Sequence, residues 1–425
     1  MTTSILFSVL VLCLIARVPI GISLGIAALS TISYSGIVTT RYLAQTLTTS
    51  LDSFPLMAVP FFILAGDLMG TGGISRRLIL VANTFLGGVT GGMAIVTVTA
   101  CMAFAAISGS GPATVAAIGG LVIPEMLRQG YDKRFVCGLI AAAGTIGVII
   151  PPSIPMVIYS VVVSSSISRM FMAGIIPGLL VGAGLVGYAY WYSRRMGYRF
   201  PAPATTFAQK FAVVREAKWA LAVPVIILGG IYGGVFTPTE AAAIAVIYGF
   251  VMGKFVYREL SWSDVPRTIA NSALTTATIL IIIGTATSFG RILTLEHIPD
   301  TIASAIAQLS SPVLIMLLIV TLLLFVGCFM ETLASIIILA PILLPIALNL
   351  GLDPTYFGIV MVVGLAIGFV TPPLGVNLFV TCGIADIPLD TLSRAILPWI
   401  GVLVTCLLLI TLFPGLSLFL PRLLM

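Results

Sequence analysis

The chain has 425 residues, of which 59% are hydrophobic and only 8% are charged, and its mean hydropathy is +1.20. Soluble globular domains carry about 25% charged residues, so the composition excludes a soluble domain and predicts an all-α polytopic membrane protein. The formal net charge of +6 comes from Lys and Arg dispersed among apolar segments. This pattern favours orientation in a lipid bilayer and argues against a nucleic-acid partner.

About ten apolar stretches are close to the roughly 20 residues that span the hydrocarbon core. The first occupies residues 4–30 and lacks the basic start and cleavage site of a signal peptide, so we expect a retained first helix. Later stretches lie at 55–70, 174–193 and 219–236. The cysteines are isolated in apolar segments, which predicts packing residues and neither disulfides nor a metal site.

Two segments of the chain repeat each other at a constant offset of 221 residues (345 minus 124). The matched residues are helix breakers and loop residues: Pro124, Gly130, Asp132, Gly147, Pro151, Pro152 and Pro177 pair with Pro345, Gly351, Asp353, Gly368, Pro372, Pro373 and Pro398. Paired apolar segments interrupted by Gly and Pro are typical of transporters in which two repeats share one site near the bilayer midplane. We expect a first repeat over 1–193, a cytoplasmic arm and scaffold helix pair over 194–267, and a second repeat over 268–425.

Loop charge predicts that the second repeat is inverted. The strongly basic loop at 194–218 is assigned to the cytoplasm by the positive-inside rule. The first repeat's RQGYDKRF carries three basic residues, whereas its equivalent NLGLDPTY carries none, as expected for loops on opposite sides. This topology predicts a cytoplasmic N-terminus and a periplasmic C-terminus. It leaves Arg169 and Arg291 on the outer side and gives neither of them a role.

A polar, helix-breaking tip precedes both Pro124 and Pro345. The tips read ISGSGPAT and GCFMETLAS, and their flanks are long enough for re-entrant hairpins at about 95–127 and about 312–350. Non-helical backbone at membrane depth is tolerated only where protein buries it or where it lines a water-filled cavity. The alternative is that GSG is a small-residue packing contact between helices.

Each hairpin is followed by a span with Gly and Pro-Pro near its middle, GTIGVIIPPSIP in the first copy and LAIGFVTPPLGVN in the second. Proline removes an amide donor and frees nearby carbonyls, so we expect broken helices at about 135–165 and about 356–382, with plain proline kinks as the alternative. Carbonyl and hydroxyl oxygens suit a small hard cation, for which Na⁺ is the natural candidate. We predict at least two sites: Ser108, Ser110, Gly147, Ile150 and Pro152 around one, and Gly327, Met330, Gly368, Thr371 and Pro373 around the other.

Half-helix N-termini after the tips would suit an anionic substrate, because their free amides carry partial positive charge. Among ionisable residues in apolar segments, Glu331 is the main functional candidate, Asp67 is a weaker one, and Glu240 is more simply a helix-starting acid. The sequence lacks the HExxH, nucleophile-elbow and Walker motifs, so we expect neither an enzyme nor an ATP-driven pump.

The tip SGSGPATVAAIG, the breaks GVIIPPSIP and GFVTPPLGVN, and the turn GGVFTPTEAAA together resemble the large membrane subunit of tripartite ATP-independent periplasmic (TRAP) transporters over nearly the whole chain. The resemblance implies Na⁺-driven secondary import of an organic acid, such as a C4-dicarboxylate or sialic acid, across the bacterial inner membrane. It also implies two partners, a periplasmic substrate-binding protein and a small four-helix membrane subunit.

The resemblance further implies an elevator mechanism, in which both hairpins and both broken helices move against a scaffold. The scaffold would include the first span and the helices near 174–193, 219–256 and 396–420. The family's ion ligands map onto the two predicted cation sites. Besides Glu331, polarity near the breaks suggests these substrate contacts: Thr114, Ser153, Asn377 and Thr381.

Two other functions remain open at this point. A stand-alone divalent-anion/Na⁺ symporter would share the inverted hairpins, but the Ser-Asn-Thr tips of that family are absent. The membrane subunit of a Na⁺-pumping decarboxylase would be expected to place an Asp in its ion path, whereas both broken helices here lack an acid.

Overall fold

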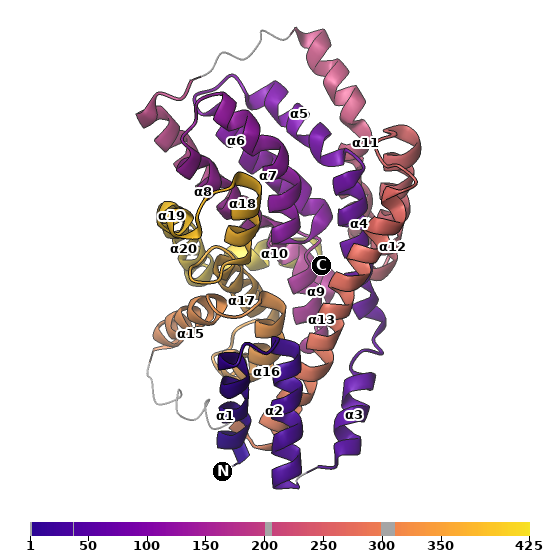
Figure 1. Cartoon of the computed structure of the whole chain (residues 1–425), viewed down its shortest axis with the longest axis vertical. Helices are drawn as coiled ribbons and strands as arrows, with labels where there is room; N and C mark the ends of the chain where they lie inside the picture. The colour runs from indigo at the N-terminus through magenta and orange to yellow at the C-terminus, as the bar shows by residue number, and fades with distance from the viewer. Residues whose placement is uncertain (1, 37, 200–205, 299–310) are drawn as a thin grey trace.

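The computed structural model describes residues 2–36, 38–199, 206–298 and 311–425, and those ranges are all-helical, as the composition predicts (Figure 1). Residues 200–205 of the predicted cytoplasmic arm lie outside the described ranges. Five described helices are long and apolar enough to cross a membrane, or six if one bent pair counts as a span. The expectation of about ten full-length stretches is therefore wrong, because several of them are divided into helices of 10–17 residues.

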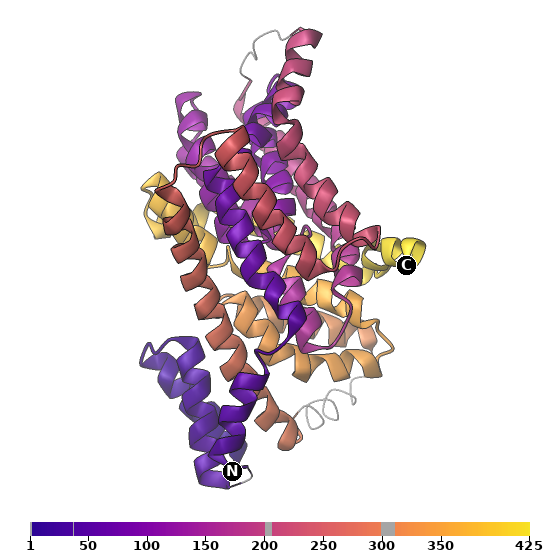
Figure 2. The ribbon, with the colours of Figure 1, turned by 90° about the vertical axis from the view of Figure 1, so that its right-hand side faces the viewer.

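One group of helices, which we call the scaffold, combines the N-terminal helices with those that follow the basic loop. Within it, α13 packs along α2, α3 and α4, and α12 packs along α4 and α11. In Figure 2 the N-terminal helices extend beyond the rest of the molecule, and the far end of α13 reaches them. The scaffold helices are α1 Thr2–Ile15, α2 Ile20–Ser35, α3 Thr40–Thr49, η1 Phe54–Met57, α4 Ala58–Thr71, α11 Phe207–Tyr232, α12 Pro238–Val251, η3 Met252–Val256 and α13 Asp264–Leu295.

The remaining helices, apart from α5 Ile74–Leu86, form a second group, which we call the core. It contains both predicted hairpins and both segments predicted to be broken, and these pack on one another across the two sequence repeats (Figure 1). The core helices are α6 Gly92–Ser108, α7 Gly111–Arg128, α8 Lys133–Gly144, η2 Thr145–Val148, α9 Ile154–Val162, α10 Ile167–Met196, α15 Pro312–Gly327, α16 Thr332–Asn349, α17 Pro354–Gly368, α18 Val376–Ala385, α19 Leu389–Ala395, α20 Leu397–Leu412 and α21 Gly415–Leu424.

Helix α5, Ile74–Leu86, connects the scaffold to the core. Its buried residues Ile74, Leu78 and Ala82 recur every four positions, which gives it one apolar face. The helix packs on α11 of the scaffold and on α6 of the core. The two groups are therefore joined here by an amphipathic connector.

The loop residues that match between the repeats have the same local role in both copies. Gly130 and Gly351 have φ values of +85° and +72°, a region that favours glycine. Asp132 and Asp353 follow them as N-caps of α8 and α17, and each carboxylate accepts a first-turn amide, at 3.0 and 2.7 Å. The repeat thus preserves a helix stop followed by a helix start.

The first predicted span, residues 4–30, is wrong as a single helix. The chain turns at Arg17, which has a φ of +61°, and α1 and α2 pack on each other as a helical hairpin. Near the start of α1, the Thr3 hydroxyl lies 3.4 Å from the Glu296 carboxylate, just beyond α13. The cytoplasmic N-terminus stays a prediction.

Two helices expected in the scaffold pack in the core instead. The predicted segments 174–193 and 396–420 lie in α10 and in α20 and α21, which contact each other and the second broken helix. Gly174, Gly178 and Gly182 explain the placement of α10, since they recur every four residues and admit side chains of α9, α6 and the first Pro-Pro break.

Arg169 gains a structural role in the core. Its Nη2 lies 2.8 Å from Oδ2 of Asp353, which joins the start of α10 to the start of α17. Nearby, the Tyr159 hydroxyl donates to the Pro354 carbonyl at 2.8 Å. These contacts connect the two repeats across 184 and 195 residues of sequence.

Candidate functional site

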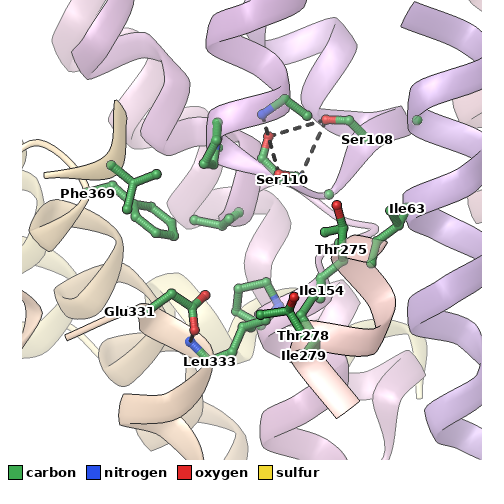
Figure 3. A pocket seen from close by; sticks show the side chains of 18 of the residues that line it. Ile63, Ser108, Ser110, Ile154, Thr275, Thr278, Ile279, Glu331, Leu333 and Phe369 are labelled. Atoms are coloured by element: carbon green, nitrogen blue, oxygen red, sulfur yellow. Dashed lines mark hydrogen bonds between the residues drawn. The ribbon is translucent and has the colours of Figure 1, made fainter. Parts of the chain in front are cut away.

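The first hairpin tip is a tight turn that collects three hydroxyl groups. Gly109 ends α6 with a φ of +61°, and Ser110 caps α7 by accepting the Ala113 amide at 3.4 Å. Ser108 Oγ lies 3.1 Å from Thr114 Oγ1, which donates to the Ser110 carbonyl at 2.8 Å. Figure 3 shows Ser108 and Ser110 side by side at this tip. Thr114, predicted as a substrate contact, therefore lies among the predicted cation ligands.

This tip lies directly against the first broken helix. The Gly109 carbonyl accepts the first amide of α9 at 3.2 Å. A Cβ atom added to Gly147 would lie 2.5 Å from the Ser110 carbonyl oxygen, and one added to Gly109 would lie 2.7 Å from the Pro152 oxygen. Ile150 is half-buried in the same break. The structure thus brings the first predicted cation ligand set together.

The second tip meets the second broken helix in the same way. A Cβ atom added to Gly327 would lie 3.2 Å from the Gly368 Cα. Thr371 lies three residues further along, and its hydroxyl donates to a carbonyl one turn earlier at 2.7 Å. Met330 is half-buried beside the tip, whereas Pro373 is exposed beyond the break. The second predicted ligand set is therefore less compact than the first.

A cavity of about 460 Å³ lies where the two tips face the scaffold (Figure 3). Residues of both hairpin tips, both broken helices, α4 and α13 line it together. Its lining includes one aromatic ring, that of Phe369, and the polar side chains of Asp67, Ser110, Thr275, Thr278 and Glu331. The two repeats therefore converge on one cavity between core and scaffold, whose mostly apolar lining carries a few polar groups.

A second cavity of about 600 Å³ adjoins the first and shares Gly66, Asp67 and Ala113 with it. It continues between α4 and α7 toward Arg76 and Glu259. These charged residues lie beside the α4–α5 turn, at the end of the scaffold where Arg77 pairs with Glu259. The central cavity thus continues toward one end of the molecule.

Glu331 has a dual position at the second tip. It is the N-cap of α16, and its Oε2 accepts the amides of Leu333 and Ala334 at 3.1 and 3.3 Å. The same side chain lines the central cavity, and Figure 3 shows its second oxygen pointing away from the helix end. A carboxylate already occupies this N-terminus, so the end of α16 is unsuited to an anionic substrate.

The other predicted substrate contacts are buried and are not among the residues that line the central cavity, although Asn377 Oδ1 lies beside Gly111 of the first tip. Ser153 donates to the Val148 carbonyl at 2.6 Å, and Thr381 donates within α18 to the Asn377 carbonyl at 2.8 Å. Asn377 uses its Nδ2 on the Ala141 carbonyl at 3.1 Å, while its buried Oδ1 has no partner in the described part of the chain. Polarity near a break did not indicate which side chains face the cavity.

On the scaffold side of the cavity the sequence singled out Asp67, but it missed the polar residues of α13. Ser272 Oγ donates to Asp67 Oδ2 at 2.5 Å, which joins α13 to α4 at the cavity wall. Thr275 and Thr278 follow on the same helix and point into the cavity (Figure 3). Their spacing of three residues places them on one helix face, and this polar stripe in an apolar helix was the available signal.

The two hairpin tips carry oxygen atoms that a cation could use. In the described ranges, no group of three or more His, Cys, Asp or Glu side chains could hold a metal ion. The oxygen atoms at the tips belong to hydroxyl groups, backbone carbonyls and one carboxylate. Such ligands suit hard cations, whereas thiolate and imidazole ligands suit softer metals.

A multi-pass helical membrane protein with paired hairpin tips around a central cavity has the architecture of a secondary transporter permease. Comparison with known families agrees, because residues 7–416 match the model described as "Tripartite ATP-independent periplasmic transporter, DctM component". The chain belongs to this family, and it is a transporter permease rather than an enzyme.

The names of the relatives refer to several different substrates. The chain is 52% identical to the isethionate TRAP transporter permease protein DctMQ of Oleidesulfovibrio alaskensis over 98% of the chain, but it spans only 66% of that relative. It is 45% identical to the C4-dicarboxylate large permease DctM of Pseudomonas aeruginosa, with 94% of each covered. It is 38% identical to the sialic acid large permease SiaM of Vibrio cholerae, with 96% of each covered.

The fold is also found in solved structures. The crystal structure of the Alcanivorax borkumensis YdaH transporter aligns with a TM-score of 0.62 over 88% of both chains. The two sequences are only 17% identical, so this likeness concerns the fold alone.

Proposed function

We propose that this chain is the large membrane subunit of a Na⁺-coupled importer of a small organic acid anion. The observation that carries the proposal is the convergence of both hairpin tips on one cavity at the junction of core and scaffold. The proposed location is the bacterial inner membrane, with Arg128, Lys133 and Arg194 at the cytoplasmic end. The second cavity then forms the route to the cytoplasm.

The two tips differ in charge, which supports different roles. The N-terminus of α7 is capped by the neutral Ser110 and can still attract an anion, whereas α16 is capped by the anionic Glu331. We therefore place the substrate anion nearer the first tip and assign the Glu331 charge to the cation. Na⁺ occupies at least two sites in this scheme, one at each tip.

The division into scaffold and core supports an elevator movement of an inverted-repeat core. Both tips and both broken helices belong to the core, and the cavity lies on its boundary with α4 and α13. A displacement of the core would carry the site while the scaffold stays in place. The proposed partners are a small four-helix membrane subunit and a periplasmic substrate-binding protein, and the longer relative DctMQ accommodates a fused subunit.

The substrate class includes small sulfonates as well as C4-dicarboxylates and sialic acid, because the 52% identical relative is named for isethionate. The test is uptake of radiolabelled isethionate, succinate and sialic acid into proteoliposomes. In separate assays, the Na⁺ gradient, the small membrane subunit or the binding protein is left out. We expect uptake of one substrate to need all three, whereas Na⁺-driven uptake by this chain alone would favour the stand-alone symporter.

Replacing Glu331 by Gln should raise the Na⁺ concentration for half-maximal uptake by about tenfold. Gln retains an acceptor for the α16 amides but removes the charge, and one charged contact contributes about 1.5–3 kcal/mol. The measurement is initial uptake rate against Na⁺ at saturating substrate. Glu125→Gln is the matched control, because that carboxylate pairs with exposed Arg128 on the same type of hairpin. An unchanged Na⁺ dependence in Glu331→Gln would remove this side chain from the cation site.

A further inference from the structure

Arg291 lies in the predicted outer half of α13, and the transport cavity does not use its charge. Arg169, assigned to the same side by the sequence, pairs with Asp353 at 2.8 Å. In the described ranges, by contrast, no carboxylate lies within ion-pairing distance of Arg291. Arg291 is exposed near the C-terminal end of α13, so its guanidinium is accessible to a ligand.

Arg291 lines a cavity of about 300 Å³ between α3 and α13. Every other lining residue carries a hydroxyl or an amide group: Tyr42, Gln45, Thr46, Thr49, Ser50 and Thr287. The lining therefore combines one cation with neutral polar groups and contains no acid. The flanking charges, Arg41, Asp52 and Glu296, do not line it.

Helix α3 presents its polar face to this cavity. Residues 42, 45, 46 and 49 are spaced so that they lie on one side of the helix. Leu43 is buried, and Leu47 packs so closely on α13 that a Cβ atom added to Gly284 would lie 3.1 Å from its Cδ2. These apolar contacts fix the orientation of α3 and hold the polar stripe near Arg291.

Two of the hydroxyl donors in the cavity are already used, because Thr49 and Thr287 donate to backbone carbonyls of their own helices at 2.8 and 2.7 Å. Other donors remain for a ligand. Among the described hydrogen bonds, none uses the side chains of Tyr42, Gln45 or Thr46 as donors. Together with a guanidinium, whose fork of N–H groups matches planar oxyanions, these groups form a donor set for an anion.

We propose that α3 and Arg291 form an oxyanion site in the scaffold, separate from the transport cavity. Its ligand is a carboxylate, sulfonate or phosphate group, supplied either by the free organic acid or by a phospholipid headgroup. Thr287 lies nine residues beyond Thr278, about 14 Å along the helix, so one anion does not occupy both cavities. The scaffold thereby holds an anion outside the transport route.

The test measures binding to the full purified chain, delipidated in detergent, by isothermal titration. The two probes are isethionate and dihexanoyl phosphatidylglycerol, and titrations use the Gly147→Ala background to disrupt the transport cavity. We expect saturable binding of one probe, weakened at least tenfold by Arg291→Gln and less by Arg291→Lys. Arg267→Gln on the same helix is the charge-matched control and should bind normally.

The probe that binds identifies the source of the oxyanion, the free acid or the lipid. If Arg291→Gln does not purify as a monodisperse protein, Thr46→Val tests the same site with the charge retained, and we expect about threefold weaker binding. The proposal is overturned if the protein with Arg291 and the Arg291→Gln variant bind the probe equally well. It is also overturned if neither probe shows saturable binding. Because uptake is not the readout, failure here is distinguishable from failure of the transport function.

Discussion

Replacing Gly147 by Ala should lower Na⁺-driven uptake by about 100-fold. The added Cβ would lie 2.5 Å from the Ser110 carbonyl oxygen and 2.6 Å from Thr114 Oγ1. Both atoms belong to the first tip, so the tip must move away from the broken helix to relieve the overlap. Displacing binding groups by about 1 Å can cost about 100-fold in rate, and overpacking itself costs about 1–3 kcal/mol.

Uptake into proteoliposomes under a Na⁺ gradient, normalised to protein content, measures this effect. Gly187→Ala is the matched control, since it adds the same methyl group to the core helix α10 where no atom lies within 4 Å. Gly368→Ala tests the second copy, where the added Cβ would overlap the Gly327 backbone, and Gly383→Ala is its open-space control. Wild-type uptake in Gly147→Ala would mean that the close tip contact is not needed for transport.

The hairpin tips and helix ends could be predicted because Gly and Pro act locally. Gly109 needs a positive φ, and the Gly130 and Gly351 turns end their helices in both copies. Such requirements depend on a few neighbouring residues, and they recur at the same offset in the repeat. The contact of Gly147 with the first tip followed from that repetition, although no single residue revealed it.

The scaffold side could not be predicted in the same way, because its contacts join distant parts of the chain. Ser272 meets Asp67 across 205 residues, and the sequence contains no local sign of that pairing. Hydropathy also failed at residues 4–30, because it counts apolar residues whether or not the backbone turns at Arg17. Ser153 and Thr381 were predicted as substrate contacts from their polarity, but their hydroxyls donate hydrogen bonds to nearby backbone carbonyls.

A disulfide between α4 and the first tip should stop transport reversibly. A Cβ atom added to Gly66 would lie 3.3 Å from the Ser108 Cβ, near the 3.5–4.5 Å range typical of disulfides, so Gly66→Cys with Ser108→Cys should form the bond on oxidation. Gly66 belongs to the scaffold and Ser108 to the core. If the core moves against the scaffold, this bond holds one conformation, and we expect at least tenfold lower uptake that a reductant restores.

The two single variants separate the bond from its parts. Ser108→Cys alone measures how much uptake is lost when a thiol replaces the hydroxyl at the proposed cation site. Gly66→Cys alone measures how much uptake is lost through the added side chain, which lies in close contact with the tip. The described native cysteines are free thiols and are present in every variant, so mass spectrometry of the oxidised double variant must locate the 66–108 bond. Full uptake with that bond intact would mean that the first tip and α4 do not separate during transport. In that case the core does not move as one body, and a local opening of the tips would have to expose the cavity.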